Sequence, residues 1–335
     1  MTALASNYPT LIDIARATDP KGGIAQVAEI LNQVNPMTDD MPMVEGNLVT
    51  GHKSTLRTAV PSPTWRKMYG GVVPTKSSRV TVTDSIGNLE DYAEIDVAIA
   101  NLGGNAMAFR ASEDAAHIEG ISQEWASKLI YGNEGLEPEA FTGFAPRFND
   151  QASDLGSNIL TSAATPDGTD NTSIYLIGWA PDKVFGIYPK GSTAGIHIND
   201  LGEVTAGDAT SGYWQAYRTH YKVQTGLVVA DWRYVVRIQI DAEDLVSDAQ
   251  TGPDLIDLMA QAIDLLPSTG NCRPIFYANR AVRGFIRRQI MNKTVGSTLS
   301  IEQLTRPNGA LIREPMFDGI PIRRCDAILS NEAGI

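Results

Sequence analysis

Residues 44–88 read VEGNLVTGHKSTLRTAVPSPTWRKMYGGVVPTKSSRVTVTDSIGN. This stretch is rich in Gly, Thr, Ser and Pro, and its run Arg79-Val80-Thr81-Val82-Thr83 alternates as a half-buried strand does. Structureless loops longer than about 15 residues are uncommon inside a compact domain. The stretch therefore predicts a long two-stranded excursion, with strands near 48–58 and 72–84. An isolated ribbon of two strands is marginally stable in water, so it needs a surface to lie against.

Aromatic and basic side chains gather at the centre of this excursion, where Trp65 is followed by Arg66, Lys67 and Tyr69. Exposed aromatic residues beside arginine are enriched at the energetic centres of protein interfaces. We therefore expect inter-subunit contacts here, and the alternative is that Trp65 packs on its own domain. The candidate contacts in the excursion are Arg57, Trp65, Arg66, Lys67, Tyr69 and Arg79.

The clearest helical pattern covers residues 105–131. Its apolar residues follow one stripe at helical spacing, and they are Phe109, Ile118, Ile121, Trp125 and Leu129. A helix of this length measures roughly 40 Å at about 1.5 Å per residue. Gly132 and Gly135 predict its end. A shorter apolar repeat predicts another helix over 24–34.

The chain after residue 174 mixes strands and helices. Apolar runs predict strands over 174–188 and 226–240, and a stretch rich in Gly and Thr between them predicts a loop over 189–212. Further elements are expected as helices over 253–266 and 279–292, a strand over 274–278, and strands within 309–329. The elements do not follow a regular βαβ rhythm, so the fold class is α+β.

The helix expected at 279–292 carries a basic strip. Arg280, Arg283, Arg287 and Arg288 are spaced to share one face, with Val282, Phe285 and Ile286 on the opposite face. The strip is interpreted as a solvated face, as a contact to acidic residues of another subunit, or as a contact to DNA. The four arginines are therefore candidate inter-subunit contacts.

Composition limits the classes of function that remain. The 335 residues are 43% hydrophobic, which suffices for a large core, and the formal net charge is -12. An acidic chain repels phosphates over its mean surface, so tight nucleic-acid binding is not expected. No secretory signal precedes the first elements, and no window approaches the roughly 18 apolar residues of a membrane span. We expect a protein that stays in the cytoplasm and has no membrane partner.

No local motif for catalysis or metal binding is found in the sequence. The four histidines are far apart, and Cys272 and Cys325 form no CxxC pair. No phosphate loop, dinucleotide fingerprint or nucleophile elbow is present. We expect no catalytic residues, no cofactor and no metal, although a catalytic triad assembled only in space would escape this reasoning.

Four stretches together resemble a known family. They are Met41–Asn47 with Thr50–His52 and Arg57; Trp65–Val72 with Lys76–Ser77 and Leu89–Glu90; Ile177–Pro181 with Gly186–Gly191; and Phe276–Arg280 with Gly319–Arg323. In this order and spacing they are similar to major capsid proteins of short-tailed phages related to Salmonella phage epsilon fifteen. Each motif alone is loose, and their joint order spans nearly the whole chain.

The resemblance implies the Hong Kong ninety-seven-type capsid fold. It implies an N-terminal arm over 1–43, an extended E-loop over 44–92, a peripheral domain over 93–145 built on a spine helix at about 105–131, and an axial domain over 146–335 that includes returning strands of the peripheral domain. It places the stretch 189–225 as a loop of the axial domain. No Lys–Asn pair of the cross-linked variant can be placed, so no covalent cross-link is expected.

The function that this resemblance implies is self-assembly. Copies form hexamers and pentamers that close into an icosahedral shell around phage double-stranded DNA, which the shell contacts only weakly. The further partners are a portal, a scaffolding protein and an outer decoration protein, and the location is the virion, assembled in the cytoplasm of the bacterial host. Two alternatives are an encapsulin-like bacterial compartment and an ordinary soluble enzyme.

Overall fold

The computed structural model describes residues 32–102, 105–162, 168–208, 212–245, 253–292, 299–305 and 311–335. Most of the expected N-terminal arm and of the helix predicted over 24–34 lies outside these residues. The chain divides into two compact units. The first contains Asn88–Ala126 and Gly195–Gln224, and the second contains Val34–Gly87, Ser127–Ala194 and Thr225–Ile335.

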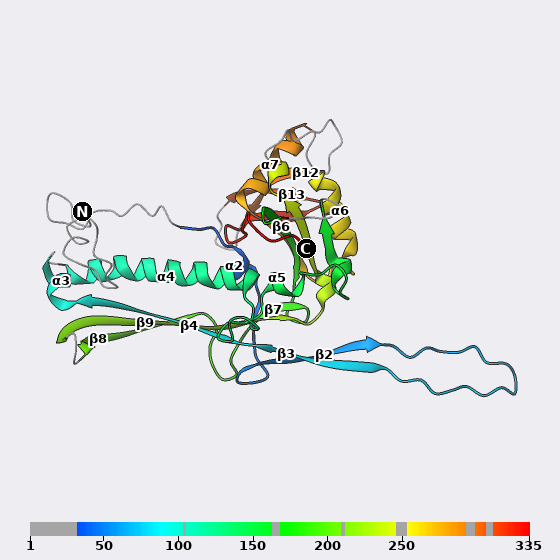
Figure 1. Cartoon of the computed structure of the whole chain (residues 1–335), viewed down its shortest axis with the longest axis horizontal. Coiled ribbons are helices and arrows are strands. Elements are labelled where there is room, and N and C mark those ends of the chain that lie inside the picture. Colours follow the sequence, from blue (N-terminus) through cyan, green and yellow to red (C-terminus); the bar gives the residue numbers. More distant parts are fainter. Residues whose placement is uncertain are drawn as a thin grey trace. The chain divides into compact units, whose positions relative to one another are not determined.

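The elements are mixed along the chain, as the sequence predicts (Figure 1). The helices are α2 (Met37–Asp40), α3 (Val97–Leu102), α4 (Ala106–Tyr131), α5 (Phe144–Arg147), α6 (Leu255–Leu265) and α7 (Arg280–Asn292), with short 3-10 helices η1 (Gly156–Asn158), η2 (Trp232–Tyr234) and η3 (Glu243–Leu245). The strands are β1 (Met43–Glu45), β2 (Gly51–Ala59), β3 (Ser78–Ser85), β4 (Gly87–Asp96), β5 (Ile159–Thr161), β6 (Asn171–Trp179), β7 (Val184–Tyr188), β8 (Ile196–Asp208), β9 (Gly212–Val229), β10 (Val235–Asp241), β11 (Arg273–Ala278), β12 (Leu299–Thr305), β13 (Leu311–Phe317) and β14 (Ile320–Arg324).

The long helix α4 agrees with the prediction for residues 105–131. Its apolar stripe packs on strands of the first unit, where Ile121 joins Ala93 and Tyr221 in one buried cluster. The helix ends at Tyr131 because the next residue, Gly132, makes a close turn. The Gly132 amide donates to the carbonyl of Lys128 at 2.9 Å, and a Cβ at this position would lie 2.4 Å from the carbonyl oxygen of Phe141.

The prediction of a loop over 189–212, or over 189–225, is correct only for residues 189–195 and is wrong from Ile196 onward. Strands β8 and β9 form an antiparallel hairpin there, paired from Ile196↔Val223 to Asp208↔Gly212. The register shifts between Asp200 and Gly202, and Gly202 has a φ of +71°, the left-handed conformation that suits a glycine at a bulge. The glycines that favoured a loop in the sequence are therefore the bulge and turn residues of a hairpin.

The second unit is built on a seven-stranded sheet with the order β12-β13-β14-β11-β6-β10-β5. The central strand β6 is buried along its whole length, and it pairs antiparallel with both β10 and β11. From β14 to β5, strands that are neighbours in this sheet are distant in the sequence, which local patterns cannot reveal. Helices α6 and α7 contact β10 and β14 respectively.

Both of these helices begin within two residues of the predicted starts at 253 and 279. The Asp254 carboxylate accepts the backbone N–H groups of Ile256 and Asp257, which caps α6 directly after Pro253. The side chain of Asn279 accepts the N–H of Val282 at 2.8 Å, which caps α7. Such caps fix where the apolar faces begin, and Val282, Phe285 and Ile286 of α7 are buried.

A buried ion pair ties the C-terminal segment to this sheet. Arg237 on β10 donates to Glu332 at 2.8 Å, and their side chains are 4% and 3% exposed. Arg237 also donates to Ser173 Oγ at 2.9 Å and to the carbonyl of Phe148 at 2.7 Å. The Tyr131 hydroxyl donates to Glu332. Burial and the Glu332 charge raise the pKa of Tyr131 far above its ordinary value, which keeps the phenol protonated as a donor.

Replacement of Glu332 by alanine is expected to lower the free energy of unfolding by about 3–5 kcal/mol, because Arg237 is left as an uncompensated buried charge. Denaturant unfolding of the unassembled subunit measures this effect. Asp182→Ala is the matched control, because its carboxylate is 75% exposed and surface ion pairs contribute about 0–1 kcal/mol. Equal losses for the two variants would contradict the assigned role of the buried pair.

Candidate subunit-contact surfaces

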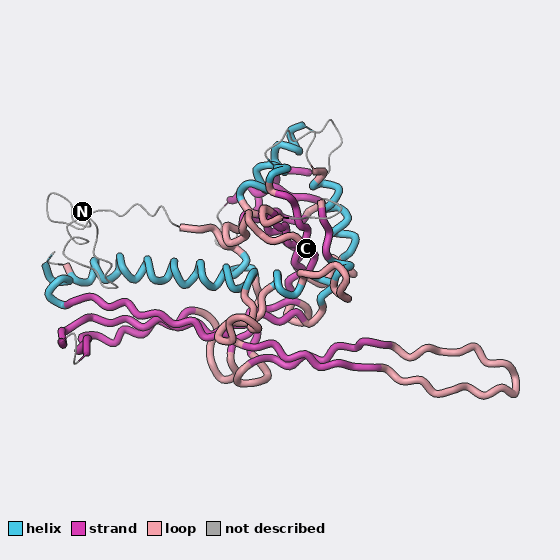
Figure 2. The backbone as a smooth tube through the Cα atoms, viewed as in Figure 1, coloured by secondary structure: helices cyan, strands magenta, loops and turns pink. Residues whose placement is uncertain are grey.

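The excursion predicted from residues 44–88 is an antiparallel ribbon of β2 and β3 (Figure 2). Among the described strands, these two pair only with each other, from Gly51↔Ser85 to Ala59↔Ser78. Strand β2 ends at Ala59, close to the predicted end, whereas β3 begins at Ser78 and not near residue 72, and residues 60–77 form an extended loop to the tip. Pro74 explains the later start of β3, because proline has no N–H to donate to a strand ladder.

The ribbon has two different faces. Cross-strand pairing places Lys53 opposite Thr83, Thr55 opposite Thr81 and Arg57 opposite Arg79. These six side chains share one face and are exposed. Leu56, Val80 and Val82 lie on the other face, and Val80 is also exposed. Neither face is covered in the way a sheet in a folded domain is covered.

The base of the ribbon is firmly held in the second unit. The Asn47 side chain exchanges two hydrogen bonds of 2.8 Å with the backbone of Lys53. Arg147 donates to the buried carboxylate of Asp84 at 2.8 Å and to the carbonyl of Leu227 at 3.2 Å. These contacts fix the base of the ribbon in the second unit. The outer half of the ribbon makes no such contacts in the described part of the chain.

The tip combines full exposure with an unfavourable backbone conformation. Trp65 is 101% exposed and Tyr69 is 105% exposed, so neither ring packs on its own subunit. Tyr69 has a φ of 66°, in the left-handed region that residues with a Cβ rarely adopt. The turn is closed by the Gly70 N–H, which donates to the carbonyl of Lys67 at 3.0 Å. Strain and exposure at one position point to a role outside the subunit.

The sequence reasoning overlooked the other apolar side chains of this ribbon. Met68 and Val73 are exposed beside the aromatic residues, and Val60 is exposed at the end of β2. The signal was present, because apolar residues that fit neither a helical nor a strand period have no partner in a local core. Together these side chains form an apolar tip that is unusual for a free surface.

The second candidate surface is the basic face of α7. Arg280 and Arg287 are exposed, whereas Arg283 is half-buried. Arg288 donates to the carbonyl of Leu245 at 3.1 Å and lies 5.3 Å from the centre of the Phe285 ring. Arg280 and Arg287 are thus exposed, whereas Arg283 and Arg288 are partly engaged within the subunit.

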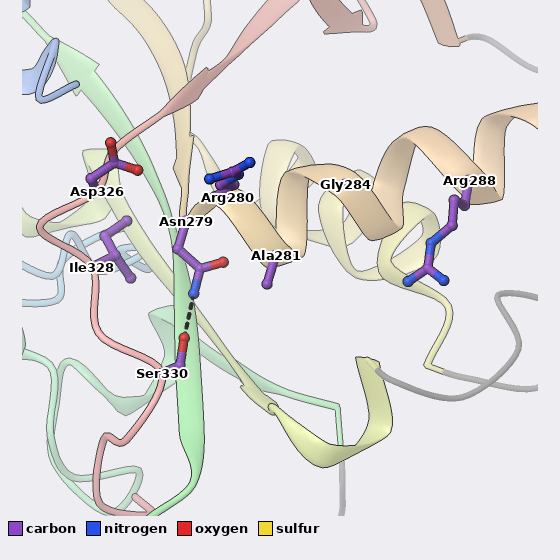
Figure 3. A pocket seen from close by; sticks show the side chains of 8 residues that line it. All are labelled: Asn279, Arg280, Ala281, Gly284, Arg288, Asp326, Ile328 and Ser330. Atoms are coloured by element: carbon purple, nitrogen blue, oxygen red, sulfur yellow. Dashed lines mark hydrogen bonds between the residues drawn. The ribbon is translucent and has the colours of Figure 1, made fainter. Parts of the chain in front are cut away.

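A shallow pocket of about 680 Å³ lies beside the start of this helix (Figure 3). Its lining residues are Asn279, Arg280, Ala281, Gly284, Arg288, Asp326, Ile328 and Ser330. The Asn279 amide donates to Ser330 Oγ at 3.0 Å, and Asp326 accepts from Arg324 at 2.6 Å. Asn279, Ser330 and Asp326 are thus held by hydrogen bonds within the subunit, and they form no nucleophile–base pair. The pocket is therefore an open surface with arginine side chains and no catalytic arrangement.

Within the described part of the chain, no cluster of His, Cys, Asp and Glu could hold a metal ion. The described helices include none that is long and apolar enough to cross a membrane. Cys325 is buried, and burial raises the pKa of its thiol to about 12.

Comparison with known proteins decides between the remaining classes. The family described as major capsid protein GP7 matches residues 19–335. A structure of bacteriophage Epsilon15 is 36% identical in sequence, covers 99% of each chain, and has a TM-score of 0.75.

The chain belongs to the GP7 family of major capsid proteins.

Two more distant structures are also similar. The capsid of bacteriophage JBD30 is 11% identical over 97% of this chain and 96% of that chain, with a TM-score of 0.48. The holo-SrpI encapsulin complex from Synechococcus elongatus is 9% identical over 65% of this chain and 93% of that chain, with a TM-score of 0.42. No curated protein sequence matches the chain.

Membership of this family confirms several predictions. The fold is α+β and of the Hong Kong ninety-seven type. The chain is a structural capsid protein and not an enzyme, and its copies associate into the shell of a phage virion.

The exposed tip makes a prediction for the unassembled capsid protein. Trypsin is expected to cut after Arg66 or Lys67 well before it cuts after Arg147 or Arg237, because the tip is exposed whereas Arg237 is buried. Mass spectrometry of an early time course identifies the first sites. Early cleavage after Arg237 with an intact tip would contradict the described ribbon.

Proposed function

We propose that this capsid protein assembles as hexamers and pentamers into an icosahedral shell, held without covalent cross-links by the ribbon and by the N-terminal arm. The ribbon corresponds to the E-loop of the family, and it lies across an adjacent subunit. The observation that carries this proposal is the tip, where Trp65 and Tyr69 are fully exposed in the single subunit.

The energetics of the ribbon support docking on a neighbour. Two strands without a third strand or a helix beside them are marginally stable in water. Their outer backbone edges also remain unpaired, which is a liability for aggregation. Contact with an adjacent subunit removes both problems at the moment of assembly, and aromatic residues with arginine are the side chains that supply most interface energy.

The domain boundaries of the family are proposed for the whole chain. The arm covers 1–43, the E-loop 44–92, the peripheral domain with its spine helix 93–145, and the axial domain with returning peripheral strands 146–335. Helix α4, which spans Ala106–Tyr131, is the proposed spine helix. The arm is proposed to contact adjacent subunits within the shell.

The net charge of the chain determines how the proposed shell contacts DNA. A net charge of -12 disfavours a firm grip on DNA, so packaged double-stranded DNA is contacted weakly and can be released.

The proposed further partners are a portal, a scaffolding protein and an outer decoration protein, with assembly in the host cytoplasm and no membrane contact. Arg280, Arg283, Arg287 and Arg288 on α7 are proposed to face acidic residues of another subunit.

Removal of the Trp65 ring tests the docking of the ribbon. Trp65→Ala is expected to weaken assembled shells by about 2 kcal/mol or more for each contact, within the range measured for interface hot spots. The subunit alone should keep its melting temperature, because the ring makes no contact within it. Shell dissociation in denaturant, followed by sedimentation, measures the first quantity.

Trp65→Phe is the matched control, since it keeps an aromatic ring and should retain most of the shell stability. Shells of Trp65→Ala that dissociate at the same denaturant concentration as the unaltered shells would exclude the tip as an anchor. A fall in the melting temperature of the free subunit would instead assign the ring to its own domain.

A further inference from the structure

The ribbon contains an unusual distribution of charge. From Gly46 to Thr83 there is no Asp or Glu, whereas the whole chain has 39 of them and a net charge of -12. The cations of this stretch are all exposed, and they are Lys53, Arg57, Arg66, Lys67, Lys76 and Arg79. Within the described part of the chain none of them makes an ion pair.

Two of these cations directly oppose each other. Arg57 on β2 and Arg79 on β3 are cross-strand partners, next to the irregularity in register between Arg57 and Ala59. Directly opposite residues in an antiparallel pair have Cβ atoms about 4.5–5.5 Å apart, and like charges at that position destabilise the ribbon. The free subunit thus places two like charges at directly opposite positions, which costs it stability.

The nearest carboxylates along the chain cannot relieve this repulsion because they are already engaged. Glu45 accepts the backbone N–H of Gly191 at 2.8 Å. Asp84 is buried and bonded to Arg147 at 2.8 Å. Both lie at the base of the ribbon, whereas Arg57 lies near the outer end of β2.

We propose that Arg57 and Arg79 form a clamp that binds one carboxylate of a second copy of this chain. Two forked guanidinium groups offer paired N–H donors to a single anion, which is the geometry that carboxylates prefer. A second copy has many carboxylates to offer, because the chain contains 39 Asp and Glu residues and has a net charge of -12. The clamp rests on the proposed docking of the ribbon, and it specifies the chemistry of the surface on which the ribbon docks.

Replacement of one clamp arginine by glutamate should leave the free subunit equally or more stable, and it should weaken assembly of the shell. Arg57→Glu places a carboxylate opposite Arg79, so the two side chains satisfy each other within one ribbon. The melting temperature of the free subunit should then stay the same or rise. The concentration of subunits needed for assembly should rise roughly tenfold or more, as expected for the loss of a charge pair across an interface.

Lys53→Glu is the matched control, because it changes the charge equally, on the same face of the same strand, opposite Thr83. It should raise the assembly concentration much less than Arg57→Glu. Arg79→Glu should reproduce Arg57→Glu. The difference in assembly concentration between Arg57→Glu and unaltered chains should shrink as salt rises from about 0.1 to 1 M, because the Debye length falls from about 10 to 3 Å.

Assembly is measured with purified subunits in the absence of DNA, by sedimentation and negative-stain microscopy. Equal effects of Arg57→Glu and Lys53→Glu, or no effect of Arg57→Glu, would overturn the clamp while shells still form. An effect seen only in DNA-filled shells would overturn it in favour of a phosphate ligand. If the unaltered chain formed no shells in any condition, the proposed function itself would fail, which is a separate outcome.

Discussion

A two-stranded ribbon cannot bury either of its faces by itself, and the rest of this capsid protein is organised around that constraint. The base of β2 and β3 is fixed by Asn47 and by the Arg147–Asp84 ion pair, so the ribbon leaves the second unit from a defined origin. Its outer half has exposed aromatic rings, unpaired cations and a strained Tyr69. These features destabilise or do nothing for a single subunit, and under the proposed docking they become favourable when another subunit supplies the missing surface. Stability of the subunit and stability of the shell are therefore separate quantities in this protein.

The two quantities are maintained by different parts of the chain. The seven-stranded sheet, its capped helices and the buried Arg237–Glu332 pair form a core that requires nothing from a neighbour. Buried ion pairs contribute little net stability but are costly to break, so this pair fixes the position of the C-terminal segment against β6 and β10. The ribbon, by contrast, keeps its charged and aromatic groups available. Such a division allows subunits to fold first and to bind each other afterwards.

Elements with strong local patterns were predictable from the sequence, and those that depend on distant pairing were not. The helix over 105–131 was predicted because five apolar residues follow one stripe, and the ribbon because no local core explains its length. The hairpin of β8 and β9 was missed because glycines at a bulge and a turn resemble the glycines of a loop. The placement of β6 between β10 and β11 depends on contacts far apart in sequence, and so does the meeting of Arg237 with Glu332. Likewise, Arg57 and Arg79 were expected as contacts, but the cross-strand register that places them opposite each other, which continues unbroken from Gly51↔Ser85, could not be read from local patterns.

The most direct test of the central claim is a cryo-EM reconstruction of assembled shells at a resolution that shows side chains. We expect residues 60–77 to lie on an adjacent subunit, with Trp65 buried at the contact and a carboxylate of that subunit between Arg57 and Arg79. A ribbon that folds back on its own subunit, or that extends into solvent with Trp65 still exposed, would contradict the account.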